Sequence, residues 1–101
     1  MTYPVGNLIQ PSPGGLSQKI AISTSSAQSA AFDSFNPVYI TVYSDTDCFF
    51  RSGANPTAVS NGTDQIIPSG PLYRIGPAQK GHKLAFITAS GSGFIYITPD
   101  N

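Results

Sequence analysis

The segment from Pro37 to Ser44 places the strongest constraint on the fold, because its side chains alternate strictly in character. Val38, Ile40 and Val42 fall on one face of an extended chain, and two tyrosines and a threonine fall on the other. β-branched and aromatic residues fill almost the whole run, which is typical of a β-strand. Both faces are largely apolar, so we expect this strand to lie in the centre of a sheet.

Shorter segments of the same character follow one another along the chain, separated by glycine, proline and asparagine turn signals. We expect strands over residues 19–24, 48–51, 65–67, 72–75, 83–89 and 94–98. No long helical period separates them, so a parallel α/β sheet is not expected. The pattern predicts an all-β fold, a small antiparallel β-sandwich or jelly-roll-like barrel of roughly six to eight strands.

The connections between these strands carry their own predictions. Residues 45–47 are expected to turn a hairpin between the organising strand and residues 48–51, and residues 90–93 to turn a closing hairpin. Residues 80–82 are expected to form another turn. The alanines of residues 25–35 allow a short helix, whereas the serines there favour a loop, and the sequence leaves both open.

The domain organisation predicted is an extended arm over residues 1–18 and a single β-domain over residues 19–101. Three prolines and a Gly-Gly pair shape the arm for extension. Its apolar side chains include Tyr3, Val5, Leu8 and Ile9. One interpretation is a frayed terminus. The other, which we favour, is an arm that lies along a neighbouring subunit.

The charge content narrows the choice of partners. Charged residues make up 10% of the 101 residues, the formal net charge is zero, and Glu is absent, against about 25% charged residues in a typical soluble domain. We expect a surface of Ser, Thr, Asn and Gln, part of it covered by a partner. Neither nucleic acid nor a membrane is an expected partner. No signal-peptide pattern or membrane-length apolar run is present, which predicts synthesis in a cytoplasm.

The residues that carry chemistry in enzymes do not form a recognisable site here. His82, the only histidine, stands in a turn between two lysines, which disfavour its protonated form. Asp45 and Asp47 fit a turn better than a calcium site. Cys48, the only cysteine, fits a small buried hydrophobe. We therefore expect no enzyme, no cofactor and no metal site.

Tyrosines are the remaining candidates for binding. Tyr39, Tyr43, Tyr73 and Tyr96 are able to stack on sugars or bases, or to fill a core edge or a subunit interface. We favour the core or the interface. Clustering of the tyrosines in a groove would instead favour a carbohydrate-binding module.

Residues from Pro37 onward resemble a group of small tailed-phage virion proteins. Their pattern is a Val/Ile-rich strand, a turn with Asp, a second strand ending near Arg-x-Gly, a Thr/Ala/Asn loop, a Pro-x-Gly turn and a closing segment ending in Ile-Thr-Pro. The matching segments are residues 38–44, 45–47, 49–53, 57–62, 68–70 and 84–99. These motifs are structural rather than catalytic, and the proline-rich arm lies outside them.

The resemblance implies a non-enzymatic virion component. We expect a capsid decoration or cement protein, a trimer that also binds the major capsid protein or other virion proteins. A tail, spike-base or head–tail accessory protein is the alternative in the same class, and a carbohydrate-binding module is the alternative in another. The expected partner-binding residues are Tyr3, Val5, Leu8, Ile9, Tyr39, Tyr43 and Tyr73.

Overall fold

The structure, a computed structural model, describes residues 16–33 and 35–100. These residues contain eight strands and no helix. The strands are β1 (Gln18–Ile22), β2 (Ala27–Gln28), β3 (Val38–Ser44), β4 (Cys48–Gly53), β5 (Gln65–Ile67), β6 (Leu72–Ala78), β7 (Lys83–Ile87) and β8 (Gly93–Asp100). The prediction of an all-β fold is confirmed.

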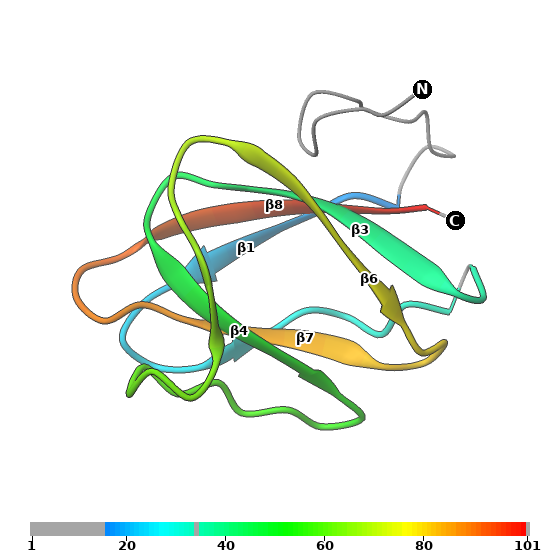
Figure 1. Cartoon of the computed structure of the whole chain (residues 1–101), viewed down its shortest axis with the longest axis horizontal. Helices are drawn as coiled ribbons and strands as arrows, with labels where there is room; N and C mark the ends of the chain where they lie inside the picture. The colour runs from blue at the N-terminus through cyan, green and yellow to red at the C-terminus, as the bar shows by residue number, and fades with distance from the viewer. Residues whose placement is uncertain (1–15, 34, 101) are drawn as a thin grey trace.

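The strands form two antiparallel sheets that pack face to face. Sheet A has the order β1-β8-β3-β6, and sheet B has the order β2-β7-β4-β5. In Figure 1, β1, β3 and β8 lie in the upper layer and β4 and β7 in the lower one. Paired strands include β1 with β8, β2 with β7, β3 with β6 and β4 with β5. The chain is therefore one long hairpin wrapped into two layers, which is the jelly-roll arrangement.

The core lies between the two sheets and is built by period-two alternation. Val38, Ile40 and Val42 of β3, which alternation placed on one face, are 0% exposed. Leu84 and Phe86 of β7 belong to the same buried cluster from the opposite sheet. β3 lies between β8 and β6, which confirms the central position predicted for it.

Two predicted hairpins are wrong. β3 and β4 belong to different sheets, and so do β7 and β8, so the turns at 45–47 and 90–93 carry the chain from one layer to the other. Ser44 and Cys48, both 0% exposed, face each other across the first turn, and the Cys48 thiol lies 3.8 Å from the Ser44 hydroxyl. Side chains on both sides of this short turn point into the core and pack against each other there. The two strands therefore need no backbone pairing with each other.

Residues 25–33 contain the short strand β2 rather than a helix. Ser29 is buried, its backbone N–H donates to the Leu84 carbonyl at 2.7 Å, and its hydroxyl accepts the Leu84 N–H at 3.0 Å. Phe32, 3% exposed, follows and donates its N–H to the His82 carbonyl at 2.9 Å. The segment is thus held against β7 and the turn at residues 80–82, and that turn is confirmed.

The start of the sheet differs slightly from the predicted boundary. β1 begins at Gln18, and the Ser17 hydroxyl shares a hydrogen bond of 2.8 Å with the Thr98 hydroxyl of β8. Residues 17 and 18, predicted to belong to the arm, therefore already contact sheet A. Residue 16 is also described, and residues 1–15 of the predicted arm lie outside the described residues.

Candidate functional site

The outer faces of the two sheets differ in how far the chain covers them. On sheet B, Ala85 points away from the core yet is 0% exposed. Gln28, its neighbour on the same face, donates from Nε2 to the Asn55 Oδ1 at 2.9 Å and to the Pro56 carbonyl at 2.6 Å. The Ser26 hydroxyl accepts the Ala58 N–H at 2.9 Å. The loop between β4 and β5 is thereby fixed over the outer face of sheet B.

Sheet A instead presents aromatic side chains to solvent. Tyr96 stands opposite Lys19 on one side and opposite Tyr43 on the other, and Tyr43 stands opposite Leu72. Phe94 lies two residues before Tyr96 on the same face of β8. Phe94, Tyr96 and Tyr43 are 41%, 42% and 36% exposed. We call these five residues the aromatic face.

Contacts within the aromatic face hold its rings in place. The ring centroids of Tyr43 and Tyr96 lie 6.1 Å apart with an interplanar angle of 38°. The Lys19 ammonium lies 4.3 Å from the Phe94 centroid and 5.7 Å from the Tyr96 centroid, within cation–π range. Side chains restrained in this way lose less conformational freedom when a partner covers them. The aromatic face is therefore suited to binding a flat apolar surface.

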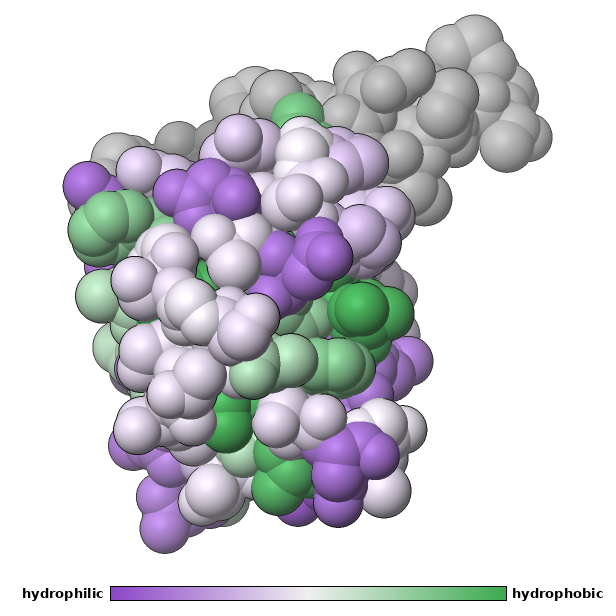
Figure 2. All heavy atoms as spheres, turned by 90° about the vertical axis from the view of Figure 1, so that its left-hand side faces the viewer, coloured by the Kyte–Doolittle hydropathy of each residue, from purple (hydrophilic) through white to green (hydrophobic). Residues whose placement is uncertain are grey.

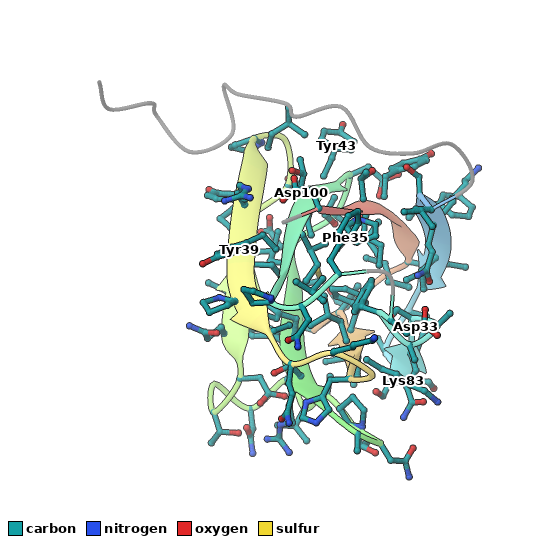
Figure 3. The ribbon with its side chains drawn as sticks, turned by 90° about the vertical axis from the view of Figure 1, so that its right-hand side faces the viewer. Asp33, Phe35, Tyr39, Tyr43, Lys83 and Asp100 are labelled. Atoms are coloured by element: carbon teal, nitrogen blue, oxygen red, sulfur yellow. The ribbon has the colours of Figure 1, made fainter. Side chains whose placement is uncertain are left out.

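A charged cluster borders the aromatic face toward the end of β8. Arg74 Nη2 lies 2.5 Å from Asp100 Oδ1, and the guanidinium lies 4.3 Å from the Tyr39 ring centroid. Asp100 is 5% exposed, and the Arg74 Nε is buried without a hydrogen-bond partner. Figure 3 shows Tyr43 and Asp100 on the upper side of the molecule, with Asp33 and Lys83 on the lower side. This ion pair fixes β6 to β8 across β3, a structural role.

Two hollows lie near these surfaces. A shallow hollow of about 470 Å³ lies beside Phe94, and its lining includes the polar residues Ser23, Asp45 and Ser92. A second hollow, of about 310 Å³, opens between the sheets beside β6. No tyrosine lines either of them. The exposed tyrosines Tyr43 and Tyr96 thus stand on a sheet face rather than in a groove.

The residues considered as catalytic or metal-binding candidates have structural roles. Cys48 is buried in β4, and this burial raises the pKa of its thiol, with the Asp47 charge adding to the rise and the Ser44 hydroxyl opposing it. Asp45 and Asp47 each accept a backbone N–H, from Phe94 at 2.8 Å and from Ser69 at 2.7 Å. Within residues 16–33 and 35–100, His, Cys, Asp and Glu nowhere gather in a group of three that could hold a metal ion. The same part of the chain has no helix suited to crossing a membrane.

The structure brings together only some of the predicted partner-binding residues. Tyr43 lies in the aromatic face, and Tyr39 lies beside it, half-buried under Arg74. Tyr73 stands opposite Val42 and packs against the core, so it does not join that face. Tyr3, Val5, Leu8 and Ile9 lie outside the described residues, and their role stays a prediction.

The sequence-based prediction missed three members of the aromatic face, Lys19, Leu72 and Phe94, and used Tyr96 only as a general candidate. Phe94 and Tyr96 alternate with the buried Ile95 and Ile97, so period two places them on one outer face. Their proximity to Lys19 and Tyr43 depends on the order of the strands in the sheet, which alternation does not predict.

Figure 2 shows the end of the molecule that faces left in Figure 1. Residues of intermediate hydropathy cover most of this end, with strongly hydrophilic and hydrophobic residues scattered among them. Comparison with known proteins found no matching family model, no matching curated protein and no matching solved structure.

Proposed function

We propose that the protein is a non-enzymatic structural subunit of a phage particle, a capsid decoration protein that self-associates as a trimer and binds virion proteins through the aromatic face. The observation that carries the proposal is the contrast between the two sheets. The β4–β5 loop covers the outer face of sheet B around Ala85 and leaves Ile66 exposed on the edge strand β5, whereas Tyr43, Phe94 and Tyr96 lie uncovered side by side on sheet A.

Physical arguments support an interface at this face. Tyrosine and phenylalanine are enriched in protein interfaces because they supply apolar area with few rotatable bonds. Burying the exposed part of three such rings is worth several kcal/mol at about 25 cal/mol per Å² of apolar surface. The jelly roll also occurs in viral capsid domains. A fold alone does not define a function, so the argument depends on the aromatic face.

The test compares two changes on opposite sheets. Phe94→Ser combined with Tyr96→Ser removes two rings from the aromatic face, whereas Ile66→Ser removes the 55% exposed Ile66 from sheet B. We expect the double variant to lose at least ten-fold in binding to particles assembled without this protein. Ile66→Ser should behave like the unchanged chain. Equal losses in both variants, or none in the double variant, would contradict the proposal.

The position in the particle needs its own measurement. A tail or head–tail component is the alternative within the same class. Labelling the bound protein and locating it by electron microscopy separates the two, because a decoration protein covers the capsid shell and a tail component does not.

A carbohydrate-binding module is a second candidate, favoured by the hollow beside Phe94, whose lining includes Ser23, Asp45 and Ser92. Hydroxyl and carboxylate groups next to an exposed ring suit a sugar, and jelly rolls also occur in lectins. Titration with soluble polysaccharides, followed by tyrosine fluorescence, tests it. Saturable binding that is lost in Asp45→Ala, with self-association unchanged, would favour this second function.

A further inference from the structure

The groove between the sheets opens at one edge of the molecule. Its volume is about 310 Å³, and its residues come from five strands of both sheets. Polar and apolar groups contribute about equally to the walls, and no charged side chain takes part; the lining residues are Ile40, Phe50, Ser52, Gln65, Ile75, Gly76, Pro77, Ala78 and Leu84. An uncharged, extended chain segment would suit such a groove.

The strand beside the groove has one edge without a partner in the described part of the chain. β6 is the last strand of sheet A and pairs there only with β3. An edge strand presents backbone N–H and C=O groups that an added strand can pair with. One added segment could therefore pair its backbone with β6 and place its side chains in the groove.

The sequence outside the described residues supplies a segment of matching chemistry. Residues 1–15 contain no Asp, Glu, Lys or Arg. In an extended conformation Tyr3, Val5 and Ile9 share one face. In a strand, the backbone groups of successive residues point to opposite sides. If Tyr3 and Val5 pair with β6, the backbone of Pro4 points away from β6, where its missing N–H is not needed. The one proline within residues 3–9 is therefore compatible with strand addition.

We propose that residues 3–9 of a neighbouring copy of this chain add a strand to the free edge of β6 and place Val5 and Ile9 in the groove. The inference rests on the proposed self-association and specifies its contact. The described chain starts just before β1, and β1 and β6 form the opposite edges of sheet A. Such a head-to-tail contact closes into a ring when the rotation between copies permits.

The test uses single cysteines on separate full-length chains that both carry Cys48→Ser. One chain carries Val5→Cys, and the other carries Ser52→Cys at the groove. We expect the mixture to form a disulfide-linked dimer under mild oxidation at least ten-fold faster than a mixture of Val5→Cys with Ser92→Cys. Ser92 lies in the β7–β8 turn, outside the lining of the groove, and is a matched exposed control. A Cys48→Ala background replaces Cys48→Ser if the serine weakens the fold.

Each other outcome has a defined meaning. Equal rates with Ser52→Cys and Ser92→Cys, in a mixture that still sediments as an oligomer, overturn the groove contact and leave the proposed function standing. A disulfide within one chain that carries both Val5→Cys and Ser52→Cys, without dimers in the mixture, shows that the arm binds its own chain and also overturns the inference. Monomeric behaviour of the unchanged protein overturns the proposed self-association itself.

Discussion

The Oδ1 atom of Asp45 accepts the backbone N–H of Phe94 at 2.8 Å and so joins the two turns that carry the chain between the sheets. The Asp45 N–H returns a hydrogen bond to the Phe94 carbonyl at 3.2 Å. The contact also fixes the start of β8, from which Phe94 and Tyr96 project into the aromatic face. The stability of this junction and the geometry of the proposed interface are therefore linked.

Gly93→Ala should weaken this junction. A Cβ at position 93 would lie 2.2 Å from both Asp45 Oδ1 and Thr46 Oγ1, so the Asp45 side chain must leave its position. We expect a loss of about 1–3 kcal/mol in the free energy of unfolding, measured by urea titration. Ser92→Ala, at the neighbouring exposed position, is the control and should change stability by less than about 0.5 kcal/mol. Equal stability of the two variants would contradict the role given to this contact.

Asp100→Ala alone should destabilise the fold more than a double change that removes both the Asp100 and the Arg74 charge. The single change leaves the Arg74 guanidinium, with a side chain 30% exposed, without its carboxylate partner. We expect a cost of about 1–3 kcal/mol, reduced by the remaining solvent contact. Adding Arg74→Met should recover part of the loss, because no uncompensated charge remains. A double-mutant cycle measures the coupling, and purely additive losses would contradict it.

Stability should decline at alkaline pH through Cys48. Burial raises the pKa of its thiol above the ordinary value of 9.0, so the folded state holds the proton more tightly than the unfolded state does. The associated stabilisation is complete below pH 9 and is lost as pH rises through the higher folded-state pKa. We expect the free energy of unfolding to fall more steeply between pH 9 and pH 10 in the unchanged chain than in Cys48→Ala. Parallel profiles would contradict this.

Gln28→Ala should uncover the outer face of sheet B. The change removes the two hydrogen bonds from Nε2 to Asn55 and Pro56 that hold the loop over Ala85. We expect faster hydrogen exchange at the Ala58 amide and a loss of about 1–2 kcal/mol in stability. Gln65→Ala, an exposed glutamine of β5 on the same sheet, is the matched control. Unchanged exchange at Ala58 would show that other contacts cover this face.

Much of the fold was predictable because side-chain alternation reports which residues face inward. Val38, Ile40 and Val42 were assigned to one shared face by that pattern alone, and all three are fully buried. Alternation does not report which strand lies beside which. A hairpin and a turn between two layers have the same local pattern, and therefore the hairpin predictions at 45–47 and 90–93 failed.

The site was less predictable than the core for the same reason. Tyr43 and Tyr96 were identified as candidates, but their contact at 6.1 Å follows from the pairing of β3 with β8. Tyr73 shows a second difficulty. Residues 72–75 place Tyr73 with Ile75 on one face and Leu72 with Arg74 on the other, so period two favours Tyr73 on the core side, but it does not separate a tyrosine in a core from one in an interface.

The wrapping of the chain also determines the order in which it is expected to fold. β4 and β5 are close in sequence, whereas β1 must find β8 at the other end of the chain. Because the entropic cost of closing a loop grows with its length, local strand pairs form first and pairing proceeds outward from β4–β5. Lys19 of β1 and Phe94 and Tyr96 of β8 then come together in the last step. The folding pathway would thereby delay assembly, since a chain that is only partly folded does not yet possess the aromatic face through which we propose that the protein binds the particle.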